Sequence, residues 1–196
     1  MTTPFSICGT AFHTPKRGEM EILADVLIEI SADGGIAALL KPDDPEYGAR
    51  KAAAARAGTL HTLAAGQYLL PGFVDLHIHA PQFPQLGKAL DAPLADWLQK
   101  YTFPLEARYA DQAFAASVYR NLVGTLIANG TTTAVYFSTR HLEASLVLAE
   151  ACLGKGQRAV IGRVAMDDEA QCPSYYRDAS PDEGIDLTRR FIHQLR

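Results

Sequence analysis

One stretch of the sequence decides the fold: PGFVDLHIHAPQ, at positions 71–82. Pro71-Gly72 is typical of a turn, and residues 68–79 read as a strand entered through it. Side chains alternate between the two faces of a strand. One face should therefore carry Phe73, Asp75, His77 and His79. The other should carry Val74, Leu76, Ile78 and Ala80, an apolar set that suits packing against helices.

Strand and helix patterns alternate through the rest of the chain. The expected strands are 68–79, 131–137 and 158–165, and the expected helices are 106–129, 141–153 and one beginning at Ser180. Asn129-Gly130 should end the first helix and Gly154 the second. Ser180-Pro181-Asp182-Glu183 combines an N-cap, a proline at the first helical position and a capping-box glutamate. Such alternation predicts an α/β fold with a parallel sheet and right-handed crossovers.

The first part of the chain reads as β structure. Turn residues separate three short apolar stretches, Phe5 to Phe12, Met20 to Ile30 and Ala32 to Leu40. Residues 41–58 fit a surface loop with a short helix. We therefore divide the chain into 1–66 and 67–196. An eight-fold barrel needs roughly 250 residues, so the second part is either a small open sheet or the opening of a barrel.

Composition excludes several classes of protein. The chain is 48% hydrophobic and 20% charged, with a net charge of -4, which is unlike the basic footprint of a nucleic-acid binder. No apolar run approaches the roughly 18 residues of a membrane span, and the N-terminus lacks the pattern of a signal peptide. Cys8, Cys152 and Cys172 form no C-x-x-C pair. We expect reduced, mostly buried thiols in a cytosolic protein.

His77 and His79 are candidate metal ligands. Two imidazoles at positions i and i+2 on one strand face can share a cation, and barrel active sites lie at the carboxyl ends of the strands. Neutral imidazole suits zinc, and also iron, copper and nickel. Asp75 could orient one of the ligands through a hydrogen bond, without binding the metal itself. The alternative is that the two histidines are satisfied polar residues near the end of a strand.

The motif P-G-F-V-D-x-H-x-H resembles the first-strand signature of the amidohydrolase superfamily. Longer motifs narrow the resemblance to its guanine deaminases: HAPQ at 79–82, WLQKYTFP at 97–104 followed by Glu106, NGTTT at 129–133 and GRVAMD at 162–167. The resemblance runs from about Leu69 to Asp167. It implies an N-terminal β-sandwich segment in residues 1–66, since members form a sandwich from both chain ends. Residues 67–196 would then be the first three βα units of an incomplete TIM-like (β/α)8 hydrolase barrel.

The resemblance also implies a role for each matching residue. His77 and His79 would bind one zinc ion per subunit, and Gln82 would hydrogen-bond guanine beside a wall formed by His79, Ala80 and Pro81. Trp97 and Phe103 match motif positions near the site, although core packing is the default expectation for an aromatic side chain. The complete enzyme would convert guanine to xanthine and ammonia, as a cytoplasmic homodimer that binds neither nucleic acid nor membrane.

Family members also need residues that this sequence does not supply. These are an Arg-Phe pair that holds the purine, two more metal-ligand histidines, a glutamate for proton transfer and an aspartate on the metal. We therefore expect the isolated chain to be inactive. The remaining histidines match no motif, so surface or satisfied polar roles are expected for His13, His61, His141 and His193.

The sequence raises three alternative functions. Another amidohydrolase deaminase, acting on cytosine, an adenosine-type substrate or a triazine, would share the H-x-H motif. A cytidine-type deaminase would use H-x-E with a later P-C-x-x-C. His141-Leu142-Glu143 matches the first motif, but no P-C-x-x-C follows it, which excludes that class. In the third alternative, the chain is a truncated product without catalytic activity.

Overall fold

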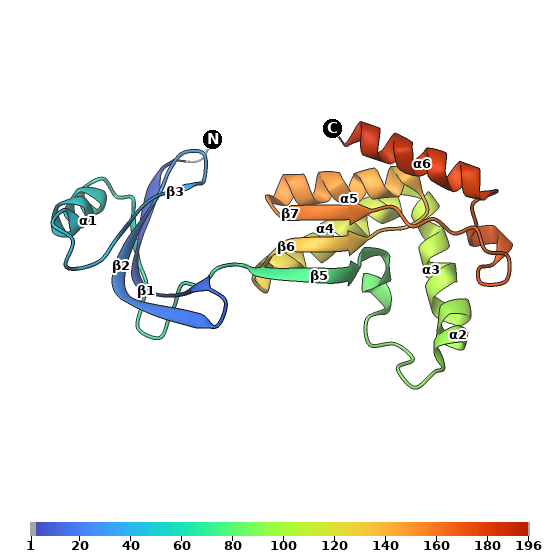
Figure 1. Ribbon diagram of the computed structural model, residues 1–196, viewed down its shortest axis with the longest axis horizontal. Coiled ribbons are helices and arrows are strands. Elements are labelled where there is room, and N and C mark those ends of the chain that lie inside the picture. The colour runs from blue at the N-terminus through green and yellow to red at the C-terminus, as the bar shows by residue number, and fades with distance from the viewer. Residues whose placement is uncertain (1–2, 196) are drawn as a thin grey trace. The chain divides into compact units, whose positions relative to one another are not determined.

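The computed structural model describes residues 3–195. The chain divides between Pro71 and Gly72 into two compact units, which are labelled by element in Figure 1. Among residues 3–195, no helix combines the length and apolar character that a bilayer span requires. All three cysteines are buried and unpaired, which confirms the expectation of free, buried thiols.

The first unit contains a four-stranded sheet in the order β3-β2-β1-β4. Its elements are β1 (Phe5–Lys16), β2 (Glu19–Ile30), β3 (Ile36–Leu40), α1 (Tyr47–Arg56) and β4 (Leu60–Thr62). β1 is antiparallel to β2 and parallel to β4, while β3 is antiparallel to β2. The third strand starts later than predicted because a turn precedes it, in which the Gly34 N–H donates to the Ser31 carbonyl at 2.9 Å.

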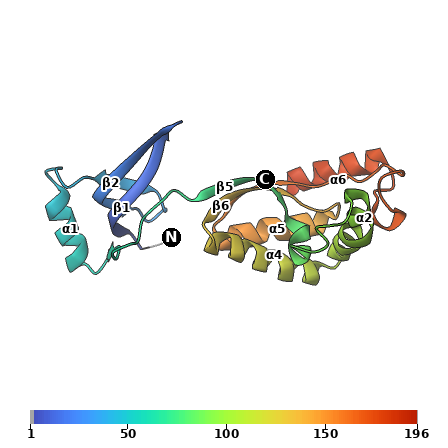
Figure 2. The ribbon, with the colours of Figure 1, turned by 90° about the horizontal axis from the view of Figure 1, so that it is seen from below.

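The second unit is built on three parallel strands in the order β5-β6-β7. The strands are β5 (Phe73–His79), β6 (Thr131–Phe137) and β7 (Arg158–Gly162), and the long helices are α4 (Gln112–Ala128), α5 (Leu142–Lys155) and α6 (Pro181–Gln194). The predicted parallel sheet is therefore confirmed, and it is open. Helices α4 and α5 lie on one side of the strands, as Figure 2 shows.

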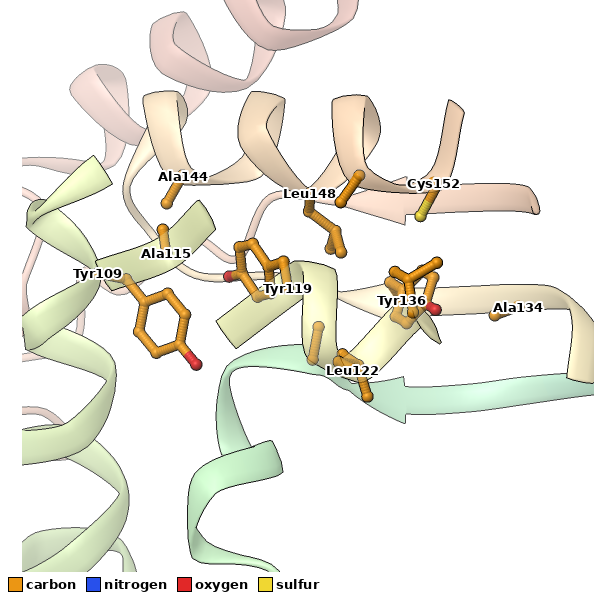
Figure 3. Packing of buried hydrophobic residues seen from close by; sticks show 12 residues of the cluster. Tyr109, Ala115, Tyr119, Leu122, Ala134, Tyr136, Ala144, Leu148 and Cys152 are labelled. Carbon is orange, nitrogen blue, oxygen red and sulfur yellow. The ribbon is translucent and has the colours of Figure 1, made fainter. Parts of the chain in front are cut away.

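A tyrosine-rich core lies between this sheet and its helices (Figure 3). Tyr109, Tyr119 and Tyr136 are fully or almost fully buried, and Leu148 reaches into the same cluster from α5. A buried phenol needs a partner for its hydroxyl, and Tyr136 donates to Gln157 Oε1 at 2.7 Å. This core fixes the face of the sheet that the helices cover.

The helix boundaries show which local signals were sufficient. Residues 106–129 do not form one continuous helix, because α4 starts anew after Asp111, which accepts hydrogen bonds from the N–H groups of Ala113 and Phe114. The predicted end at Asn129-Gly130 is confirmed. The predicted end at Gly154 is wrong, because α5 continues to Lys155 and ends at Gly156, whose φ is 70°. Ser180 Oγ accepts from the Glu183 N–H at 3.1 Å, which confirms the predicted start of α6.

Short helical segments follow β5 and connect it to α4. They are η1 (Ala80–Gln85), α2 (Leu94–Trp97), the π-helical η2 (Leu98–Thr102), α3 (Phe103–Ala107) and η3 (Arg108–Ala110). Another short segment, η4 (Ser174–Tyr176), lies between β7 and α6. The sequence patterns did not indicate η1, α2, η2 or η4. Together these segments place side chains beside the carboxyl end of β5.

Candidate metal and substrate site

The two predicted ligand histidines converge near the carboxyl end of β5. Their Nε2 atoms lie 3.2 Å apart, and their ring centroids lie 5.1 Å apart. Phe137, at the end of β6, packs against both rings at centroid distances of 4.6 and 4.9 Å. Burial, and secondarily the neighbouring His77, lowers the pKa of His79. The lowered pKa favours the neutral imidazole, which is the form that binds metal.

This geometry fits two ligands of one zinc ion. Two nitrogens at 2.0–2.1 Å from a tetrahedral zinc lie about 3.3–3.4 Å apart, close to the observed 3.2 Å between the Nε2 atoms. The same separation allows a direct N–H···N hydrogen bond, which a shared cation would replace. Within residues 3–195, no three His, Cys, Asp or Glu side chains form a group that could hold a metal. The described residues therefore fit half of a four-coordinate site.

The simple alternation predicted for β5 does not hold through the whole strand. The pairing with β6 is irregular between Asp75 and Ile78, which pair with Ala134 and Tyr136. Both partners belong to the core under the helices, and residues paired across strands share a face. Asp75 therefore belongs to the strand face that packs on the core, contrary to the prediction that it lies on the histidine face. One added residue in a strand produces such a change.

Asp75 nevertheless contacts the histidine strand directly. Its Oδ1 accepts a hydrogen bond from the His77 backbone N–H at 3.0 Å, so it supports the main chain beside the first histidine. The predicted apolar set of β5 is divided. Ala80 is fully buried and Ile78 packs against the core, whereas Leu76 is 70% exposed and Val74 59% exposed.

The turn η1 carries Gln82 and is fastened at both ends. The Pro81 carbonyl accepts from the Tyr109 hydroxyl at 2.9 Å. Gln85 Nε2 donates to Thr102 Oγ1 at 2.8 Å. Because all four of these residues are buried, the turn has little freedom to move away from the end of β5.

Gln82 itself is held by a glutamate. Its Nε2 donates to Glu106 Oε1 at 3.0 Å, and the hydroxyl of Tyr176 donates to Glu106 Oε2 at 2.5 Å. Burial raises the pKa of Glu106, and the two hydrogen bonds oppose that rise. No role for Glu106 was predicted from the sequence. The available signal was its position two residues after the WLQKYTFP motif.

The two aromatic residues of that motif have structural surroundings. Phe103 is buried in a cluster with Cys172 and Tyr176, as expected for core packing. The Trp97 indole N–H donates to the Lys88 carbonyl at 3.1 Å. His141 lies in a partly buried position where burial, aided by Arg140, lowers its pKa to about 4.

Four of the predicted site residues line one open cavity of about 420 Å³. Asp75, His77, His79 and Gln82 contribute polar groups to it. Its apolar walls include Phe83, Leu86, Leu122 and Leu126. An apolar cavity with a few convergent polar groups is the usual form of a small-molecule site.

Comparisons with known proteins identify the family of this chain. The model of the amidohydrolase family matches residues 68–195. A probable guanine deaminase of Schizosaccharomyces pombe is 41% identical over 189 residues, covering 95% of this chain and 35% of the relative.

Two solved structures are also similar, and each match covers 98% of this chain and 43% of the solved chain. The Escherichia coli guanine deaminase has a TM-score of 0.82 at 26% identity. The enzyme of C. acetobutylicum, solved with guanine bound in the active site, has a TM-score of 0.78 at 27% identity. This chain thus spans less than half the length of each.

Proposed function

The chain belongs to the amidohydrolase family, and from that premise we propose that it is the N-terminal part of a zinc-dependent guanine deaminase. The complete enzyme would hydrolyse guanine to xanthine and ammonia. The observation that carries this proposal is the convergence of His77 and His79 beside Gln82 on one cavity. The similarity of the chain to guanine deaminases over 95% of its length supports the choice of substrate.

The proposed architecture places the described residues in a larger whole. Residues 1–66 would form one part of a β-sandwich, and residues 67–196 the first three βα units of a (β/α)8 barrel. Three parallel strands with α4 and α5 on one side support the second assignment. In such a barrel, the carboxyl end of β5 would face the active site.

His77 and His79 would supply two of the ligands for one zinc ion per subunit. When bound, zinc lowers the pKa of water to about 7 and so supplies a nucleophile at neutral pH. Phe137 packs against both imidazoles and would limit their rotation. Asp75 would keep the strand backbone in place through its hydrogen bond to the His77 N–H, and orientation of a ligand imidazole remains part of its proposed role.

Gln82 would bind the purine, with His79, Ala80 and Pro81 beside the base. Because the Ala80 and Pro81 side chains are buried, we assign the wall at these two positions to the main chain. No described residue is assigned to the proton transfers or to the Arg-Phe pair that holds the purine in family members. We therefore propose that the isolated chain is inactive. We further propose a cytoplasmic homodimer that binds neither nucleic acid nor membrane. The net charge of -4 supports only the lack of nucleic-acid binding.

A second candidate is another amidohydrolase deaminase, acting on cytosine, an adenosine-type substrate or a triazine. It would use the same histidine pair. Gln82 within HAPQ, followed by the WLQKYTFP motif, favours guanine over these substrates. A truncated, non-catalytic chain is the alternative outside catalysis.

Turnover by the full-length protein tests the proposal. The zinc-loaded enzyme should form xanthine and ammonia from guanine, with a higher kcat/KM than for cytosine, adenine or a triazine. It should contain one zinc per chain by elemental analysis. The isolated 196-residue chain should form no xanthine. A substrate other than guanine with the highest kcat/KM would replace the assignment.

A further inference from the structure

Glu106 is a buried carboxylate to which the proposed chemistry assigns no role. Its side chain is only 6% exposed, although burying a carboxylate is unfavourable unless its oxygens are hydrogen-bonded. Both oxygens are occupied, one by the Gln82 amide nitrogen and the other by the Tyr176 hydroxyl. The partners come from distant parts of the chain, 24 and 70 residues away. One carboxylate thus joins η1, α3 and η4.

The chemistry of this contact decides which way the Gln82 amide faces. An ionised carboxylate can only accept hydrogen bonds, whereas an amide has a donor end and an acceptor end. The reverse orientation would place the Gln82 oxygen against the Glu106 oxygen, with no proton between them. Glu106 therefore selects the observed orientation, with Nε2 toward itself. The Gln82 oxygen, on the opposite side of the amide carbon, is directed away from Glu106.

We propose that Glu106 is a positioning residue that turns the Gln82 carbonyl oxygen toward the substrate as a hydrogen-bond acceptor. In this role Gln82 receives an N–H group of the base, instead of offering its own amide nitrogen as the main contact. The inference rests on the proposed function, because it assigns a binding mode to the same site. It adds a residue, Glu106, that does not touch the substrate.

The surrounding contacts explain why Glu106 can impose an orientation. Tyr176 is fully buried and holds the second carboxylate oxygen, so Glu106 cannot easily rotate away from Gln82. Hydrogen bonds to an ionised acceptor are roughly twice as strong as neutral ones. The turn that carries Gln82 is itself fastened through Pro81 and Gln85. The amide is therefore the remaining adjustable group, and Glu106 fixes it.

An exchange of the two side chains tests the proposal in the zinc-loaded, full-length enzyme. Glu106→Gln offers Gln82 either end of an amide, so the orientation is no longer selected. We expect roughly a tenfold loss of kcat/KM, as for one weakened hydrogen bond. Gln82→Glu places two carboxylates in contact, and like charges at this distance disfavour ionisation of one of them. We expect a loss of roughly a hundredfold or more.

The double variant, Gln82→Glu with Glu106→Gln, should recover most of the activity. Gln at 106 donates to the carboxylate at 82 and accepts from the Tyr176 hydroxyl, so every donor keeps a partner. The second oxygen of the residue at 82 still faces the substrate as an acceptor. We expect kcat/KM within about tenfold of the parent, which is the loss expected when one hydrogen bond is weakened. A double variant no more active than Gln82→Glu would overturn the acceptor role.

The division between KM and kcat separates positioning from general loosening of the fold. Binding of the base is lost equally from ground and transition states, so Glu106→Gln should mainly raise KM. Tyr136→Phe is the control, because it removes a buried hydrogen bond, from the Tyr136 hydroxyl to Gln157 Oε1 at 2.7 Å, in the core away from the Gln82 turn. It should lower the Tm comparably to Glu106→Gln but change kcat/KM less than about threefold.

The outcomes distinguish this inference from the proposed function. A parent enzyme that does not deaminate guanine would reject the proposed function. A parent that deaminates guanine, with unchanged kinetics in Glu106→Gln, would reject only the role of Glu106. That result would also follow if Glu106 were protonated and donated to Gln82, so it overturns the proposed direction of the hydrogen bond.

Discussion

Two polar groups beside the end of β5 differ sharply in their surroundings. His77 and His79 are exposed, and their Nε2 atoms face each other at 3.2 Å. Glu106 and Tyr176 are buried, and both Glu106 oxygens are occupied by protein donors. The exposed pair has capacity for an added ligand, whereas the buried group is committed to holding segments of the chain together. Substitutions in the two groups should therefore affect different quantities.

Removing the exposed pair should have the largest effect on chemistry. His77→Ala or His79→Ala in the full-length enzyme should abolish stoichiometric zinc and lower kcat/KM for guanine by roughly a thousandfold or more. Elemental analysis and xanthine formation measure these changes. The free energy of unfolding of the zinc-free protein should change by less than about 1 kcal/mol, because neither side chain lies in the core.

His61 provides the matched control for this experiment. It is an exposed histidine with no predicted role, so His61→Ala should retain zinc and activity. Full zinc occupancy in the His77→Ala, His79→Ala double variant would refute the ligand assignment. A large loss of stability in the zinc-free single variants would instead remove the contrast with the buried group.

A buried ion pair should give the largest effect on stability. The side chains of Arg163 and Asp178 are both 0% exposed and lie 2.6 Å apart, and Asp178 also accepts from the Met166 N–H at 3.0 Å. Asp178→Ala leaves a guanidinium buried without its charge partner, which costs about 3–5 kcal/mol. Urea denaturation measures this loss.

The exposed pair Asp186–Arg189, at 3.3 Å, is the control for that loss. Asp186→Ala should change the free energy of unfolding by no more than about 0.5 kcal/mol, because surface ion pairs contribute little. Equal losses at Asp178 and Asp186 would show that burial does not set the strength of these pairs.

Gln82 lies between the two groups, since it contacts the buried carboxylate and lines the cavity of the histidines. Gln82→Ala should retain zinc and lower kcat/KM for guanine by roughly five- to a hundredfold, as expected for loss of one hydrogen bond worth about 1–3 kcal/mol. Steady-state kinetics at saturating zinc measure the change. A loss below about twofold with intact metal would leave Gln82 without a substrate role.

The sequence was sufficient where a pattern is local. Apolar periodicity and β-branched runs predicted β6 correctly from Thr131 to Phe137. Alternation of strands and helices then predicted the parallel sheet. The H-x-H motif placed His77 and His79 together because two strand positions are separated by a fixed distance. These features follow from backbone geometry within a few residues.

The sequence was insufficient where contacts are long-range. Glu106 meets Tyr176 across 70 positions of sequence, and no local signal predicts such a contact. The irregular pairing at Asp75 depends on the fit between β5 and β6, so strict alternation placed that side chain incorrectly. The motifs thus proposed the site positions, which stay predictions, whereas the contacts around those positions required the structure.

Two glycines near the end of α5 provide the smallest expected effect, with opposite signs. Gly154 lies inside the helix, and Gly156 follows it at a φ of 70°. A Cβ at either position would meet no atom within 4 Å, so backbone preference alone decides the outcome. Gly154→Ala should stabilise the protein by up to about 1 kcal/mol, because alanine is the better helix former. Gly156→Ala should destabilise it by about 1 kcal/mol, because alanine disfavours the left-handed conformation. Thermal denaturation of both variants measures the difference, and a destabilising Gly154→Ala with a neutral Gly156→Ala would place the helix end at Gly154 after all.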